Sequence, residues 1–155
     1  RAFARGESGV ADEIRRRFMN GGAAREASAP AAVAAARAAG QAAAVPHMGA
    51  HALGAAAYAA RAAALAAPGR PQALEEEVCW QLRQLSPAAR EALRRLPRVG
   101  ENPAGPLGPG LLASGVLGSI VRDLQAGLEG ADDTGYRERN GFATGTSGPS
   151  ARQSA

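Results

Sequence analysis

Lysine is absent from this chain, and cysteine and aromatic residues are scarce. Its 155 residues include one cysteine, one tryptophan, two tyrosines and three phenylalanines. So few aromatic and β-branched residues leave little material for a sheet, which argues strongly against all-β and doubly wound folds. A single cysteine cannot form an intrachain disulfide, so a disulfide-stapled secreted scaffold is excluded and a cytoplasmic location is expected.

Alanine, glycine and arginine dominate the residues that are present. The chain holds 40 alanines and 20 glycines, all 18 basic residues are arginine, and the net charge is +4. Because alanine has the best helix propensity, helices are expected. Polar residues interrupt the alanine-rich stretch 31–67, so we expect no membrane span. The arginines are spread along the chain, and their charge permits acidic partners without identifying one.

Capping residues, helix breakers and apolar spacing predict an all-α fold, an antiparallel bundle of five to six helices. The expected helices span residues 9–20, 30–45, 47–67, 71–85, 87–96 and 111–128. Ser8 is the expected cap of the first helix, and Gly21-Gly22 its expected stop. The expected buried stripe of this helix has apolar residues four apart: Val10, Ile14 and Phe18.

The second and third expected helices are faced with small residues, which let helix axes approach closely. These residues are Ala36, Gly40 and Ala44 on one helix and Gly49, Gly54 and Ala57 on the other. Pro46 either separates two helices or kinks a single element, and the sequence leaves both alternatives open.

The larger apolar residues come later in the chain. The fourth expected helix carries them at Leu74, Val78, Leu82 and Leu85. The fifth opens with Ser86 as cap and turns Leu93 and Leu96 inward. The sixth has an amphipathic stripe of Val116, Leu117, Ile120, Val121, Leu124 and Leu128.

The composition predicts four segments. Residues 1–97 form a helical domain that we expect to be truncated at its N-terminus, because the chain opens mid-pattern without methionine. Residues 97–110 hold four prolines and four glycines, so 98–110 is the expected linker. Residues 111–128 are the C-terminal amphipathic helix, and 129–155 are an expected disordered tail.

No catalytic or cofactor-binding motif is visible, so we expect neither an enzyme nor a bound cofactor. His47 and His51 are four residues apart and would share a helix face. This pair can hold a metal only with a third ligand, and we favour packing at the rim of the bundle. Cys79 follows three glutamates that disfavour a thiolate, so we interpret it as a structural cysteine.

Trp80 is the most informative single residue. On a helix it points about 150 degrees away from the centre of the fourth helix's apolar stripe. It therefore either packs on another segment or anchors a partner, since tryptophan dominates interface hot spots. Tyr58 is expected on one helical stripe with His47, His51, Gly54 and Arg61 and invites the same two interpretations. The candidate partner-binding residues are thus Trp80, His47, His51, Tyr58 and Arg61.

The order of residues in three places resembles one bacterial helical family. These are the opening Arg1-Ala2-Phe3-Ala4-Arg5-Gly6-Glu7, the run 30–67 with Arg-Ala-Ala-Gly-Gln and His-Met-Gly-Ala-His-Ala-Leu-Gly, and the segment 80–97. The family is that of the immunity proteins of polymorphic toxin systems, found widely in actinobacteria, with some members labelled exonuclease subunits. The resemblance covers residues 1–97 and implies a cytoplasmic helical protein that binds and blocks a cognate toxin by occlusion.

Two other hypotheses stand beside this one. A nucleic-acid-associated helical protein is the alternative that the positive charge and the exonuclease label suggest, although no aromatic residues interleave with the arginines. A metal-dependent enzyme built on His47 and His51 ranks third. The sequence identifies neither the toxin nor the oligomeric state.

Overall fold

The structure, a computed structural model, describes residues 5–103 and 105–130, without the side chains of residues 17–21. Every regular element within these residues is a helix, which confirms the expected all-α class. The elements are α1 (Val10–Glu26), α2 (Pro30–Ala44), α3 (His51–Ala66), α4 (Ala73–Gln84), α5 (Pro87–Arg94), the short 3-10 helix η2 (Leu111–Ala113) and α6 (Gly115–Glu129).

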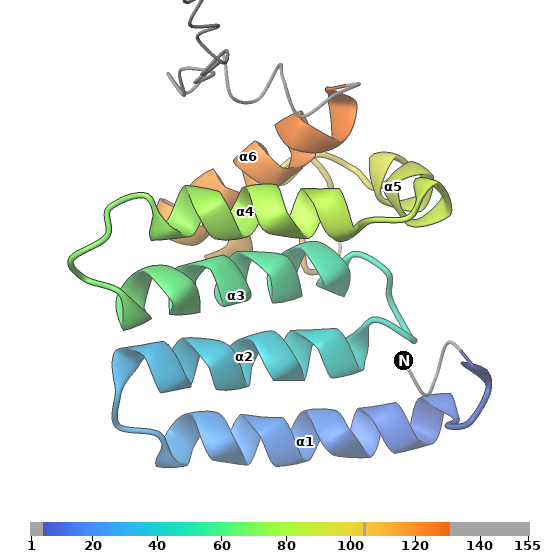
Figure 1. Cartoon of the computed structure of the whole chain (residues 1–155). Coiled ribbons are helices and arrows are strands. Elements are labelled where there is room, and N and C mark those ends of the chain that lie inside the picture. The colour runs from blue at the N-terminus through green and yellow to red at the C-terminus, as the bar shows by residue number, and fades with distance from the viewer. Residues whose placement is uncertain (1–4, 104, 131–155) are drawn as a thin grey trace, which may run out of the picture.

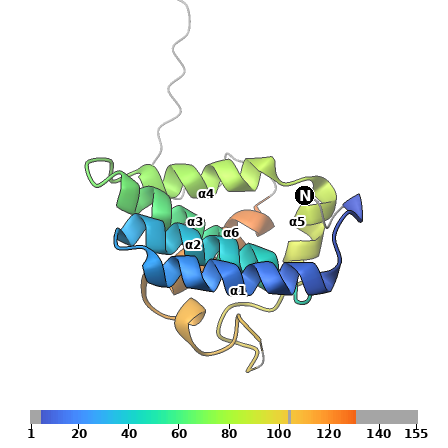
Figure 2. The same cartoon turned by 90° about the horizontal axis from the view of Figure 1, so that it is seen from below.

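Helices α1 to α4 lie side by side in chain order, each antiparallel to the last, as an uninterrupted layer (Figure 1). Helix α6 packs against α3 and α4, and α5 packs against α6 near the end of α4. Helix α1 lies at the outer end of this layer, away from α5 and α6 (Figure 1), and it is the foremost helix in the view from below (Figure 2). The expected antiparallel bundle is therefore confirmed. Helices beyond the layer pack at its α3–α4 end.

The hydrophobic core lies between α3, α4, α6 and the segment that precedes α6. Its largest fully buried side chains are Leu53, Leu107, Ile120, Leu128, Val78 and Val121. Helix α2 buries only the alanines Ala34, Ala43 and Ala44. Because a buried alanine removes little apolar surface from water, α1 and α2 add little to this core.

Helix α1 begins and ends differently from the prediction. Gly9 is its N-cap, and Ser8 instead donates a hydrogen bond from Oγ to Glu13 Oε1 at 2.8 Å. The predicted stop is wrong, because the helix continues through Gly22 to Glu26. A glycine ends a helix where it turns to positive φ, and Gly22 does not. Two glycines cost the helix about 2 kcal/mol in propensity, which the alanines that follow and the packing on α2 offset.

The expected buried stripe of α1 is also wrong. Val10 and Ile14 are 41% and 37% exposed, and the side chain of Phe18 lies outside the described residues. Glu13 occupies the buried side of this helix instead and is 8% exposed. It accepts hydrogen bonds from Ser8 and Arg16, which is how a carboxylate tolerates burial.

Residues 45–50 separate α2 from α3, so Pro46 ends an element rather than kinking one. The third helix begins at His51, four residues later than expected. The expected close approach of the two helices is confirmed at Gly54. A Cβ atom there would lie 2.8 Å from both Gln41 Oε1 and Leu112 Cδ1. Gly49, by contrast, is exposed in the turn and takes no part in the contact.

The fourth and fifth helices follow the sequence closely. Val78 and Leu82 are buried, and the rest of their stripe, with Leu93 and Leu96 of the α5 segment, packs partly buried against the core. Ser86 caps α5 as predicted, because its Oγ accepts a hydrogen bond from the Ala89 amide at 3.2 Å.

The predicted single helix 111–128 is interrupted. The chain forms η2, leaves the helical path at Ser114, and resumes as α6 from Gly115, whose φ is +55°. A Cβ at Gly118 would lie 2.5 Å from the Ala113 carbonyl, so the fold back onto α6 needs a glycine there. Val116 is 47% exposed, against expectation, while the other five residues of the stripe are buried.

The segment 98–110 packs against the core. Leu107 is 1% exposed, and its carbonyl accepts a hydrogen bond from the Gly100 amide at 2.7 Å. The buried Gln125 of α6 accepts from the Val99 amide at 3.1 Å and donates to the Pro97 carbonyl at 2.9 Å. The expected division at residues 97 and 110 stays a prediction, because packing in one core does not show which segment folds alone. Of the expected tail 129–155, Glu129 ends α6, and residues 131–155 lie outside the described ones.

Two arginines of α5 fasten three helices together. Arg90 donates from Nη2 to the Leu82 carbonyl at 2.8 Å and from Nη1 to the Gly127 carbonyl at 3.0 Å. Arg94 donates from Nε to the Leu128 carbonyl at 2.6 Å. The last carbonyls of a helix lack intrahelical partners and carry partial negative charge, so the arginines stabilise the ends of α4 and α6.

Arg90→Met should lower the free energy of unfolding by about 2–4 kcal/mol, because two carbonyls lose a charged donor. The matched control is Arg95→Met. Arg95 forms an exposed pair with Glu91, and its loss should cost less than about 1 kcal/mol. Urea denaturation of the full chain measures both variants, and equal losses would contradict the role given to Arg90.

Removal of residues 98–155 should abolish cooperative thermal unfolding, because it uncovers Leu53, Val78 and Leu82. Circular dichroism of fragment 1–97 checks this, with the chain ended at residue 130 as control. A fragment 1–97 that unfolds cooperatively near the midpoint of the control would support residues 1–97 as an independent domain.

Candidate partner-binding surface

Helix α4 presents one side to the core and the other to solvent. Glu75 and Glu76 stand in its first turn and Arg83 in its last, where their charges complement the helix dipole. Trp80, midway along, is 52% exposed, while Val78 is fully buried. The orientation of Trp80 away from the apolar stripe is therefore confirmed.

Charged side chains flank Trp80 along the exposed face of α4. Glu76 and Arg83 precede and follow it by four and three residues, and both are exposed. Arg70, in the turn before α4, forms an ion pair with Glu76. The exposed face thus joins one large aromatic side chain to groups of both signs, the mixture typical of protein interfaces.

The predicted stripe on α3 is turned toward α2. His51 is 7% exposed, and its Nδ1 lies 2.7 Å from Gln41 Oε1 of α2. Tyr58 is 4% exposed, and the guanidinium of Arg37 of α2 lies 5.8 Å from its ring centroid. A partner would therefore reach little of either side chain, whereas Arg61 is half-buried and more accessible.

His47 lies in the exposed turn before α3 rather than on the helix itself. Its ring still meets that of His51, with centroids 5.1 Å apart and planes tilted by 51°. In residues 5–103 and 105–130, no group of three or more His, Cys, Asp or Glu side chains is placed to hold a metal ion. Among the described residues, the pair has no third side chain placed to complete the site that the metal hypothesis requires.

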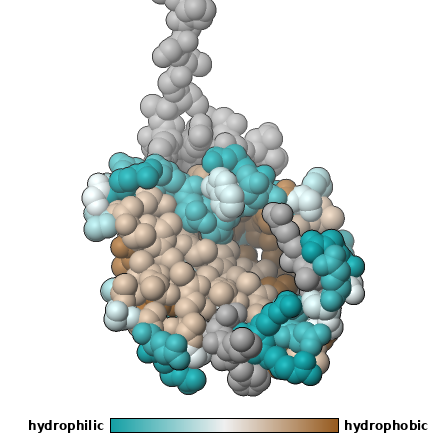
Figure 3. Space-filling view, turned by 60° about the horizontal axis from the view of Figure 1, so that its bottom comes forward, coloured by the Kyte–Doolittle hydropathy of each residue, from teal (hydrophilic) through white to brown (hydrophobic). Residues whose placement is uncertain are grey.

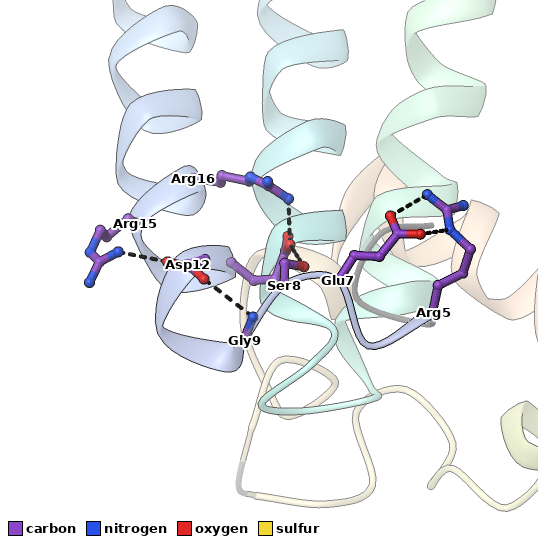
Figure 4. Close-up of polar contacts among 8 residues, drawn as sticks. Arg5, Glu7, Ser8, Gly9, Asp12, Arg15 and Arg16 are labelled. Atoms are coloured by element: carbon purple, nitrogen blue, oxygen red, sulfur yellow. Dashed lines mark hydrogen bonds and ion pairs between the residues drawn. The ribbon is translucent and has the colours of Figure 1, made fainter.

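Many of the described arginines have partners within the chain. Figure 4 shows two pairs near the start of α1, Arg5 with Glu7 and Arg15 with Asp12. Arg16 forms a third pair, with the buried Glu13. Hydrogen bonds from Arg5 also hold the pKa of the exposed Glu7 carboxyl below its ordinary value. Arg95 and Arg98 form further pairs with Glu91 and Glu129. Such pairing reduces the positive field offered to a phosphate backbone.

The layer formed by α1 and α2 adds a second, weakly hydrophobic surface. Its exposed alanines on α2 are Ala32, Ala35, Ala39 and Ala42. Figure 3 shows the side on which α1 lies as a broad pale area framed by hydrophilic residues. A row of alanines offers area without the large side chains that anchor a partner.

Two glutamines have structural roles that the sequence did not predict. Gln41 is the only amide side chain of α2 and bonds to His51, and Gln125 ties α6 to residues 97–99. The available signals were a polar side chain within the alanine-rich α2 and an amide placed between the apolar residues Val121 and Leu128 of α6. Burial forces such a group to find a partner.

Two further features of the described residues bear on earlier expectations. Cys79 is half-buried on α4, as expected of a structural cysteine. No described helix has both the length and the hydropathy needed to cross a membrane.

Comparison with known proteins identifies a family that this chain resembles. A family model described as "Imm-5 like putative immunity protein" matches residues 1–88, which run from the N-terminus through α4 into the start of α5. No curated protein and no solved structure matches the chain.

Asp123 is a half-buried carboxyl on α6, apart from the surface just described. Burial raises its pKa above the ordinary value, and the neighbouring Arg122 opposes that shift. A raised pKa in the folded state means that the protonated carboxyl favours folding. The contribution is complete below the unfolded-state pKa and is lost as the pH rises through the folded-state pKa.

Asp123→Asn should therefore raise the thermal midpoint at pH 7 and leave it unchanged near pH 3. We expect a rise of roughly 1–3 °C, small because solvent screens a half-buried group. Scanning calorimetry at the two pH values measures it, with the exposed Glu101→Gln as control. A larger rise of the thermal midpoint at pH 3 than at pH 7 would show that the direction assigned to the Asp123 pKa shift is wrong.

Proposed function

This chain belongs to the family of Imm-5 like putative immunity proteins, and from that premise we propose that it binds and neutralises a cognate toxin protein. The inhibition we propose is non-catalytic and works by covering a surface that the toxin needs. A polymorphic toxin system of an actinobacterium would be the setting, and the cytoplasm, which keeps a lone cysteine reduced, would be the compartment.

The exposed Trp80 is the observation that supports a surface for this role. An indole that is 52% exposed leaves apolar area in water, and a partner that covers it gains the free energy of that burial. Tryptophan also loses little conformational entropy on binding, because it has only two side-chain torsions. On the core side of the same helix, Val78 and Leu82 are buried, so the indole projects from a helix that is held in place by packing.

The flanking charges fit a polar rim around this anchor. Glu76 and Arg83 would pair with opposite charges on the toxin, which favours orientation more than affinity. We also propose His47 and Arg61 as contacts, because His47 is exposed and Arg61 half-buried. His51 and Tyr58 would act from the interior, since the His51–Gln41 hydrogen bond and the contact of the Tyr58 ring with Arg37 join α3 to α2.

Trp80→Ala should reduce the affinity for the toxin at least 30-fold, the loss of a hot spot of about 2 kcal/mol or more. Full-length protein is immobilised and exposed to nuclease-treated lysate of its source cells, and the retained proteins are quantified by mass spectrometry. A retained protein that kills cells when expressed alone, and spares them when this chain is co-expressed, is the toxin.

The matched control is Leu111→Ala. Leu111 is 64% exposed and lies on η2, away from α4, so its loss should leave capture unchanged. Equal capture of the toxin by wild type, Trp80→Ala and Leu111→Ala would show that Trp80 does not contribute to the interface. Capture of nucleic acid alone, without any toxic protein, would favour the nucleic-acid alternative.

A further inference from the structure

A pocket of about 120 Å³ lies between α3, α4, α5 and α6. Leucines from all four helices form most of its wall, among them Leu53, Leu82, Leu93 and Leu128. Helix α3 also contributes the small side chains Ala52 and Ala56. Ala52, Ala56 and Leu93 are half-buried, so the pocket is partly open to solvent beside these residues.

The polar side chain on the pocket wall, that of Gln81, already forms hydrogen bonds within the protein. The Gln81 amide donates from Nε2 to the Ala56 carbonyl at 3.3 Å and to Glu77 Oε1 at 2.9 Å. The remaining wall is aliphatic. An ionised or strongly polar ligand would therefore lose its hydration in this pocket without gaining a partner.

The fold keeps this space from collapsing. Alanine on α3 leaves room where a leucine would fill the pocket. Helix α5 cannot move inward, because Arg90 and Arg94 hold it against the carbonyls of Leu82, Gly127 and Leu128. Apolar cavities that the surrounding side chains leave unfilled are known to take up small apolar molecules.

We propose that this pocket binds one small, uncharged, apolar molecule, of the size of a single benzene ring. The volume sets this limit, since apolar cavities of roughly 150 Å³ take up benzene or xenon, and sites for drug-sized ligands start at about 300 Å³. The site is separate from the exposed face of α4 that carries Trp80, so it goes beyond the proposed function.

Benzene is the probe, and titration of the full chain is followed by methyl resonances in nuclear magnetic resonance spectra. Saturable shifts are expected at the leucines of the wall, with a rise of the thermal midpoint by roughly 2–4 °C at saturation. Benzoate has the same ring with a charge and should cause neither effect. Absence of saturable shifts with benzene, or equal shifts with benzoate, would overturn the proposal.

Two variants fill the pocket from α3, Ala56→Leu and Ala52→Leu, so that one remains informative if the other fails to fold. Each should reduce the benzene-induced methyl shifts at least 10-fold. The control Ala35→Leu adds the same side chain to an exposed position of α2 and should bind benzene as the wild type does. Unchanged benzene binding in a folded filled variant would show that the ligand sits elsewhere.

Discussion

The burial of the apolar face of α6 against α3 and α4 is the interaction on which this structure depends. Helices rich in alanine form readily but remove little apolar surface from water when they pack. The missing free energy must come from larger side chains. Helix α6 supplies five of them, Leu117, Ile120, Val121, Leu124 and Leu128, each worth about 1.5–3 kcal/mol when fully buried. Without α6, the layer of α1 to α4 would have an open, uncovered side.

The position of α4 follows from that burial and explains why its surface is available. Helix α3 packs on one side of α4 and α6 on another, and Arg90 of α5 donates a hydrogen bond to the Leu82 carbonyl near the end of α4. Three neighbours fix its rotation, and Trp80 is left on the remaining side. The protein therefore holds a large aromatic side chain in water on a well-supported helix. A free loop would lose more entropy when a partner bound to it.

The contact between α2 and α3 shows how a nearly uniform surface acquires a defined register. Alanine faces pack closely in many offsets, because one methyl group resembles the next. The Gln41–His51 hydrogen bond and the space left by the missing side chain of Gly54 match only one offset of the two helices along their axes. The stripe of His51, Gly54 and Tyr58, which the sequence left open between packing and binding, lies in this contact. Its polar members hold the layer together and are largely hidden from solvent.

The sequence by itself determined the helical class, most helix boundaries and the exposure of Trp80, because propensity, caps and spacing act over a few neighbouring residues. Ser86 capped α5 and Trp80 faced outward as the local pattern required. Tertiary structure decided the rest. Helix α1 continues past Gly22, and the last helix is interrupted at Ser114. The α3 stripe faces α2, and Leu107 packs into the core. The break at Ser114 follows from the positive φ of Gly115 and the close approach of Gly118 to Ala113. The other outcomes depend on contacts between residues distant in the chain, which the spacing of residues along the sequence does not reveal.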